Sequence, residues 1–219
     1  MKETTLKIYN ELFERYPSLN IEKESILRTY LILEECYKTK NKILICGNGG
    51  SASDSEHIVG ELMKQFKKKR KMNENVYNKL GEYGEEGKKL QNTLEGSLRS
   101  IALTSHIALS TAFSNDKEPT VVFAQQLYGL ADSGDVLISL STSGNSENCV
   151  LASILAKTMG VKTVAITGKN ESRLSKVCDV TIKVPESETY KVQELHLPVY
   201  HALCAMLEEE IFCKYKEFL

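Results

Sequence analysis

Apolar residues recur at helical spacing in the first forty residues of the chain. One such segment covers residues 3–16 and the other residues 21–40, and Pro17 and Ser18 separate them. The repeated positions are Leu6, Tyr9, Leu12 and Phe13 in the first segment and Ile26, Tyr30, Leu33 and Tyr37 in the second. We therefore predict two helices ahead of the first strand.

Short apolar segments alternate with helical patterns in the rest of the chain. The first, Lys42 to Cys46, is apolar from Ile43 onward, as in a strand covered on both faces, and it leads through a glycine-rich loop into a helical pattern from Ala52 to about Phe66. Further strand-like segments are 100–106, 135–144, 162–168 and 180–185, and further helical ones are 118–131, 145–159 and 190–214. This alternation predicts an α/β fold with a doubly wound, flavodoxin-like sheet of five parallel strands flanked by helices. Ligands of such sheets bind at the carboxyl ends of the strands, where the strand order reverses.

Residues 67–97 interrupt this alternation. The segment is rich in Lys, Glu, Asn and Gly and has almost no apolar periodicity, so we interpret it as an insertion in a single domain that covers residues 1–219, with the N-terminal helices in residues 1–40. Six of the eight residues from Lys64 to Lys71 are basic. Such a run is usually a solvated surface, and contact with nucleic acid or a phosphate is the alternative.

Composition limits the possible functions. The chain has 219 residues, of which 42% are hydrophobic, enough for one substantial core. It contains neither an apolar run typical of a signal peptide nor one long enough to span a bilayer, and its six cysteines show no CxxC spacing, so we expect a soluble cytoplasmic protein with free thiols. A net charge of −1 makes nucleic acid an unlikely partner and membrane binding unexpected.

The first loop with candidate chemistry is glycine-rich and lies between a buried strand and a helix. In Gly47, Asn48, Gly49, Gly50 and Ser51 the missing side chains let the backbone approach a ligand, and free N–H groups at the helix start favour an anion. The string also satisfies G-x-G-x-x-A, but a dinucleotide site needs an acidic residue about 20 positions further on, where this chain has its basic run. A tight turn without a ligand is the other alternative.

The second loop follows the strand-like segment 135–144 and is rich in hydroxyl groups. Its hydroxyl residues are Ser141, Thr142, Ser143 and Ser146. Hydroxyls combined with the N–H groups of a helix start suit phosphate oxygens without a lysine. A helix N-cap needs only one such residue, so four favour an anion site over an ordinary cap.

Four segments together resemble the sugar isomerase (SIS) domain family. They are GNGGSASDSEHIVGEL, STSGNS, ITGK and QELHLPVYH. Within the family, the spacings H-x-x-x-E and Q-x-x-x-x-x-x-x-H are similar to those of the metal-dependent phosphoheptose isomerases. The resemblance implies a cytoplasmic homotetramer that converts sedoheptulose 7-phosphate to a heptose 7-phosphate, with zinc or another divalent metal as cofactor.

The resemblance also implies roles for individual residues. Substrate would bind to Asn48, Gly49, Gly50, Ser51, Asp116, Ser141, Thr142, Ser143, Ser146 and Gln193, and the metal to His57, Glu61, Gln193 and His201. Glu61 and His201 would form the acid/base pair, with Glu61 removing a proton beside the substrate carbonyl and His201 serving oxygen.

The spacing of the candidate ligands gives an independent test. His57 and Glu61 are four residues apart in a helical pattern, so they share one face, although a surface ion pair has the same spacing. Gln193 and His201 are eight apart, which separates their Cα atoms by ~12 Å on a straight helix, with Pro198 between them. We interpret His196, which is closer to Gln193, as structural.

Two positions depart from the phosphoheptose isomerase pattern. Gln65 replaces an arginine and Tyr190 an aspartate, so an SIS enzyme with a different reaction or a shorter sugar stays open. The main alternative from another class is a non-catalytic sugar-phosphate sensor or a partner of a replication-initiator protein, which needs no metal ligands.

Overall fold

A parallel sheet forms the centre of the computed structural model, which describes residues 1–213. The described chain contains five strands in the order β2-β1-β3-β4-β5, and all neighbouring pairs are parallel. The strands are β1 (Ile43–Gly47), β2 (Ser100–Ala102), β3 (Val136–Leu140), β4 (Lys162–Thr167) and β5 (Val180–Lys183). The chain passes from β1 to one neighbour, β2, and then returns to the other, β3. The predicted α/β class and five-stranded parallel sheet are therefore confirmed, with the order reversal at β1.

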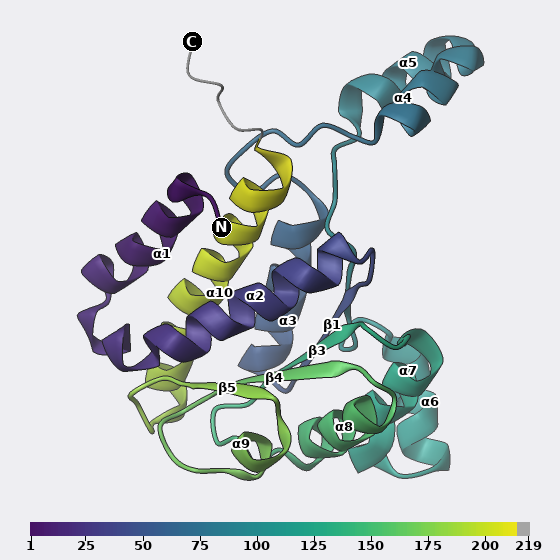
Figure 1. The fold of residues 1–219 in the computed structure, drawn as a ribbon. Coiled ribbons are helices and arrows are strands. Elements are labelled where there is room, and N and C mark those ends of the chain that lie inside the picture. Colours follow the sequence, from purple (N-terminus) through teal and green to yellow (C-terminus); the bar gives the residue numbers. More distant parts are fainter. Residues whose placement is uncertain (214–219) are drawn as a thin grey trace.

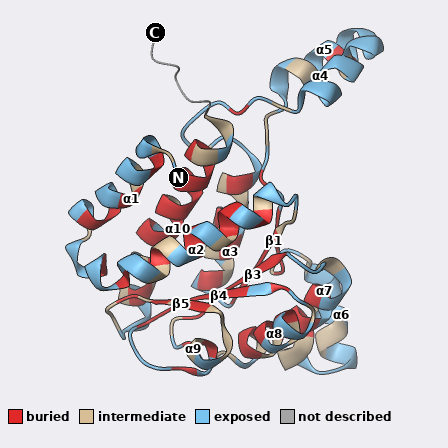
Figure 2. Cartoon of the chain, in the orientation of Figure 1, coloured by how far each residue is buried: buried red, intermediate tan, exposed pale blue. Residues whose placement is uncertain are grey.

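Helices cover both faces of the sheet (Figure 1). One face carries α1 (Glu3–Arg15), α2 (Lys23–Lys38), α3 (Gly50–Met63) and α10 (Thr189–Phe212), and the other carries α6 (Ile107–Asp116), α7 (Val122–Leu130), α8 (Glu147–Thr158) and α9 (Arg173–Val177). Short 3-10 turns lie at Pro17–Glu22 and Pro119–Val121. Side chains alternate along the strands: Ile43 and Ile45 belong to the core under α2 and α10, whereas Leu44 and Cys46 belong to the core under α7 and α8. Figure 2 shows this burial on both faces of the sheet.

The helix α10 positions several candidate site residues. It runs without a break through Pro198, and its buried residues include Val192, Val199, Leu203 and Leu207. The predicted end at residue 214 lies outside the described residues. Because the helix is continuous, residues spaced four apart along it face the same way.

The insertion is helical, which the sequence pattern did not predict. It forms α4 (Glu74–Leu80), a 3-10 turn (Gly81–Tyr83) and α5 (Gly84–Thr93), and this pair stands away from the sheet (Figure 1). Asn73 caps α4 by accepting hydrogen bonds from the backbone N–H groups of Asn75 and Val76. The helices pack closely at Gly87, where a Cβ atom would lie 1.8 Å from the carbonyl oxygen of Leu80. The cap at Asn73 and this close backbone contact stabilise the two helices in place of the apolar stripe that would have predicted them.

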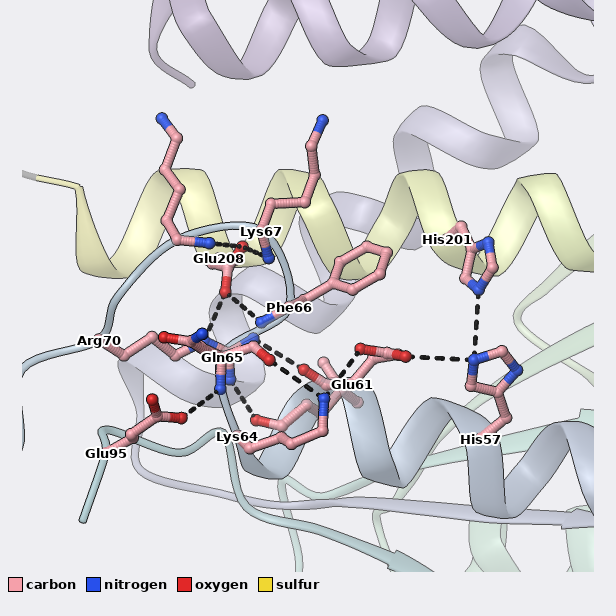
Figure 3. Close-up of polar contacts among 12 residues, drawn as sticks. His57, Glu61, Lys64, Gln65, Phe66, Lys67, Arg70, Glu95, His201 and Glu208 are labelled. Atoms are coloured by element: carbon pink, nitrogen blue, oxygen red, sulfur yellow. Dashed lines mark hydrogen bonds and ion pairs between the residues drawn. The ribbon is translucent and has the colours of Figure 1, made fainter. Parts of the chain in front are cut away.

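The basic run at the start of the insertion is only partly a solvated surface. Arg70 is buried and its Nε donates to Glu208 Oε1 at 2.8 Å, while its other nitrogens donate to the carbonyl oxygens of Leu62 and Glu61 at 2.6 and 2.7 Å (Figure 3). Glu208 also accepts from the backbone N–H groups of residues 66, 67 and 68. For Arg70 the predicted solvated surface is therefore wrong, because this side chain closes the carboxyl end of α3 and holds the following loop against α10.

The remaining differences between the predicted and the observed elements are small. The strand expected over 100–106 ends at Ala102, because the chain turns at Leu103 and Thr104, where the N–H of Ser105 donates to the carbonyl oxygen of Ala102. No element was predicted for α6 or α9, although α9 has a capping box between Ser172 and Ser175.

Candidate active site

The two candidate loops lie side by side at the carboxyl ends of β1 and β3. Gly47 pairs with Leu140 in the sheet register, so the residues that follow each strand emerge at the same level. Between the loops is a cavity of about 290 Å³, and its walls include Asn48, Gly49, Gly50, Ser51, Ser141, Thr142, Ser146, Thr189 and Gln193. This is the position at which an open α/β sheet binds ligands.

The second loop directs part of its hydroxyl groups into this cavity. Ser141 and Ser146 line it and lie 2.9 Å apart, Oγ to Oγ. The carbonyl oxygen of Thr142 accepts a hydrogen bond from the N–H of Gly168, which ties the loop to the end of β4. The Oγ of Ser143, in contrast, accepts from the N–H of Asn145 within the loop, and Ser143 does not line the cavity. The helix α8 begins directly after Ser146, so its free N–H groups add to the positive potential there.

A pair of side-chain amides joins the glycine loop to the start of α8, directly after the second loop. Asn48 donates to the side-chain oxygen of Asn148 at 2.9 Å and accepts from the Asn148 amide at 2.9 Å. Asn148 also accepts from the N–H of Cys149, which fixes its orientation. The sequence analysis did not identify Asn148 as a site residue. The only clue in the sequence is its position two residues after Ser146.

Gln193 lies against the glycine loop. A Cβ atom at Gly50 would be 2.4 Å from Gln193 Nε2, so any other residue at this position would displace the amide from its present place. Gly49 has a φ of 55°, a left-handed value that also favours glycine. The two glycines therefore allow the amide of Gln193 to reach the wall of the cavity.

His57, Glu61 and His201 form a second group, between α3 and α10 (Figure 3). His57 Nε2 lies 3.1 Å from Glu61 Oε1 and 3.5 Å from His201 Nε2. On its other side, His57 Nδ1 lies 3.1 Å from the hydroxyl oxygen of Tyr200, which donates to Asp54 Oδ1 at 3.1 Å. The structure thus brings three of the four predicted metal ligands together through contacts with His57, and it places the fourth, Gln193, beside Gly50.

Burial affects this second group. Burial, and then the neighbouring His57, lower the pKa of His201, which favours its neutral form. The side chain of Glu61 is only 15% exposed. His201 also lines a cavity of about 400 Å³ between α1 and α10, together with Arg15 and Phe66. Both acid/base candidates are therefore partly shielded from water, and His201 is reachable from this cavity.

Among residues 1–213, no group of three or more His, Cys, Asp or Glu side chains is arranged to hold a metal ion as it stands. The chemistry of the atoms around His57 nevertheless suits a cation. If the Tyr200 hydroxyl donates to Asp54, it accepts from His57 Nδ1, and the Nε2 of the neutral ring then presents a lone pair to the Glu61 carboxylate. Two acceptors 3.1 Å apart need a proton or a cation between them.

Four other residues considered in the sequence lie outside both groups. Asp116 is exposed at the end of α6 and does not line the cavity between the loops. His196 is fully buried, its ring nitrogens have no hydrogen-bond partner, and burial lowers its pKa to about 4. Gln65 and Tyr190 are exposed.

Two residues of this region were missed by the sequence analysis, Asp54 and Tyr200. Their signal was available, since Asp54 is three residues before His57 on the same helix face and Tyr200 precedes His201.

All six cysteines are free. Over the described part of the chain, no helix has both the length and the apolar character needed to cross a membrane.

Comparison with known proteins gives a consistent result. The SIS domain profile matches residues 102–207. The chain is 40% identical to a phosphoheptose isomerase of Nitratiruptor sp. over 82% of each chain, and 36% identical to a phosphoheptose isomerase of Akkermansia muciniphila over 91% of each. Its structure is similar to that of a phosphoheptose isomerase from Francisella tularensis, with a TM-score of 0.72, 26% identity, and coverage of 95% of this chain and 100% of the other.

Proposed function

Because the chain belongs to the phosphoheptose isomerase family of SIS-domain proteins, we propose that it interconverts sedoheptulose 7-phosphate and an aldose heptose 7-phosphate. The observation that carries the proposal is the contact of His57 with both Glu61 and His201, between α3 and α10, two helical turns from Gln193, which lines the cavity between the loops. An acid/base pair near an anion site is what aldose–ketose isomerisation of a sugar phosphate needs.

The substrate phosphate is expected to bind between the loops. Ser141, Thr142 and Ser146 offer hydroxyls, and the starts of α3 and α8 offer N–H groups. Asn48, Ser51 and Gln193 then contact the sugar. Holding the phosphate fixes the position of the remote reacting carbons, so binding energy contributes to their orientation. Asp116 and Ser143 stay in the proposal as substrate contacts that require movement of their segments.

Proton transfer is assigned to the second group. Glu61 removes the proton next to the substrate carbonyl and returns it to the neighbouring carbon, and His201 exchanges a proton with the oxygen. The lowered pKa of His201 keeps its ring neutral at pH 7, so one ring nitrogen can donate and the other accept. Gln193 and His201 are two turns apart on the continuous helix α10, ~12 Å along its axis, so a metal ion that both bind would lie between them.

We propose His57, Glu61, His201 and Gln193 as ligands of zinc or another divalent metal. The lone pair of His57 Nε2 and the carboxylate of Glu61 are suitable donors for such a cation. When bound, the metal supplies electrophilic polarisation of the substrate oxygens. For Gln193 to join the set, its amide must turn away from Gly50.

We also propose that the protein works in the cytoplasm as a homotetramer. Free thiols at all six cysteines agree with a reducing compartment, and the helical insertion exposes Val76, Tyr83 and Leu94, apolar side chains of the kind that subunit contacts cover. Light scattering of the purified chain measures the assembly; a monomer at micromolar concentration would contradict it.

The function is tested with a panel of five-, six- and seven-carbon ketose phosphates and the metal-loaded protein, with aldose formation followed by NMR. We expect turnover of the seven-carbon ketose and metal bound to the purified protein. If the protein isomerises nothing and holds no divalent metal, yet is thermally stabilised by sugar phosphates, the sugar-phosphate sensor is the correct function. Turnover of a shorter sugar alone would identify a different specificity, to which Gln65 and Tyr190 would be the first candidates.

A further inference from the structure

A chain of hydrogen bonds leads from Asp54 to the candidate metal site. Asp54 and His57 lie one turn apart on α3, and Tyr200 of α10 stands between them, 2% exposed. The Tyr200 hydroxyl is 3.1 Å from Asp54 Oδ1 and 3.1 Å from His57 Nδ1. Tyr200 also packs edge-on against His57 and His201, with ring centroids 5.6 and 5.0 Å away. Its position is therefore fixed on both sides.

The direction of each hydrogen bond follows from the number of protons available. A phenol has one proton, and a carboxylate only accepts, so Tyr200 donates to Asp54. The Tyr200 oxygen must then accept from His57, which places a proton on Nδ1. The reversed order would leave the oxygens of Asp54 and Tyr200 3.1 Å apart with no proton between them.

The consequence lies at the other ring nitrogen. A neutral imidazole with its proton on Nδ1 has a lone pair on Nε2. That atom lies 3.1 Å from Glu61 Oε1 and 3.5 Å from His201 Nε2, at the centre of the group. The other tautomer would direct an N–H to the same place and would exclude a cation.

We propose that Asp54 and Tyr200 are positioning residues that hold His57 in the tautomer with the proton on Nδ1, so that Nε2 is the ligand atom for a divalent metal shared with Glu61 and His201. The inference rests on the metal site of the proposed function. Neither residue touches the substrate, and both act through His57. Partners of this kind orient a metal-binding histidine and typically change metal affinity by about 10- to 100-fold when they are removed.

Tyr200→Phe is the sharpest test, because it removes the hydroxyl and keeps the ring. Zn²⁺ affinity is measured by competition with a chelating dye, and the tautomer of His57 is measured in the metal-free protein by ¹⁵N NMR of the imidazole. We expect Zn²⁺ to bind about 10- to 100-fold more weakly than to the wild type, and His57 to lose its fixed proton on Nδ1. Asp54→Asn, whose amide can donate to Tyr200, should shift both readouts in the same direction.

The matched control is Tyr9→Phe. Tyr9 is also a buried tyrosine whose hydroxyl donates one hydrogen bond, to the Lys23 carbonyl oxygen at 2.9 Å, but it lies in the core away from His57. We expect it to leave Zn²⁺ affinity and the tautomer unchanged. Equal losses of affinity in both phenylalanine variants would indicate a general effect on the fold and would overturn the proposal.

The remaining outcomes separate this proposal from the function itself, because neither measurement needs a substrate. Wild-type affinity in both Tyr200→Phe and Asp54→Asn, or an unchanged Nδ1–H signal in Tyr200→Phe, refutes the positioning role alone. A wild-type protein with no affinity for Zn²⁺ refutes the metal site and this proposal with it. Absence of sugar turnover, with the expected loss of Zn²⁺ affinity in the variants, refutes only the isomerase reaction.

Discussion

Replacing Arg70 with methionine is expected to lower the free energy of unfolding by about 3 kcal/mol. The side chains of Arg70 and Glu208 are 0% and 1% exposed, so the substitution leaves a buried carboxylate without its ion-pair partner. Removing one partner of such a pair costs about 3–5 kcal/mol, and we expect the lower end because Glu208 keeps three backbone N–H donors. In a chain of this size, that loss corresponds to a melting temperature roughly 6–12 °C lower.

Thermal and urea unfolding, followed by circular dichroism, measure this loss. The control is Lys69→Met, the exposed basic neighbour, for which we expect a change within about 0.5 kcal/mol. Adding Glu208→Gln to the methionine variant removes the unpaired charge but keeps an oxygen for the backbone donors, so part of the loss should be recovered. If Arg70→Met unfolds like Lys69→Met, the buried pair does not hold the end of α3, and the explanation given for the basic run is wrong.

Three further changes test the site and the sheet. Gly50→Ala places a Cβ 2.4 Å from Gln193 Nε2 and displaces this flexible amide, and the loss of one substrate hydrogen bond should lower kcat/KM for the sugar phosphate by about tenfold. In the same helix, Gly60→Ala meets nothing within 4 Å and should instead raise stability by about 0.5–1 kcal/mol. Steady-state kinetics and urea unfolding of both variants measure these effects. Asn148→Ala removes both hydrogen bonds between the side chains of Asn48 and Asn148 and should weaken sugar-phosphate binding about tenfold in calorimetry. Unchanged affinity would show that other contacts hold the glycine loop against α8. Burial raises the pKa of Asp135, but hydrogen bonds and the Lys42 ammonium outweigh it, so the pKa is lowered overall. The ionised carboxylate therefore stabilises the fold fully above its unfolded-state pKa, and this stabilisation is lost as the pH falls through the folded-state pKa. Between pH 6 and pH 2 the free energy of unfolding should depend less on pH in Asp135→Asn than in the wild type, and an equal pH dependence would contradict this assignment.

The fold was largely predictable because strands buried on both faces leave a clear signal. The segments around Ile43, Val136 and Val164 are short and apolar between helical patterns, and such alternation has few solutions other than a parallel sheet. The helices of the insertion left no such signal, because α4 buries no residue and depends on the cap at Asn73. Arg70 was misjudged for a related reason: its partner Glu208 is 138 residues away, and nothing in a local charge pattern reveals that contact.

The site was predictable where its residues are close in sequence. The loops at Gly47 and Ser141 were placed together by the rule that ligands bind where the strand order reverses, and His57 and Glu61 by their spacing on one helix. The contact of His201 with His57 and the location of Gln193 over Gly50 depend on how α10 packs against α3, which periodicity does not specify. The metal ligands and the substrate contacts stay predictions.

Turnover of sedoheptulose 7-phosphate by wild type and Glu61→Gln at equal metal content is the most direct test of the proposed reaction. Aldose formation is followed by NMR, and substrate binding is measured in parallel by calorimetry. We predict that Glu61→Gln lowers turnover by ~10² to 10⁴ while substrate still binds, because an amide cannot accept the proton that the carboxylate removes. Undiminished turnover in Glu61→Gln would exclude Glu61 as the base and contradict the proposed mechanism.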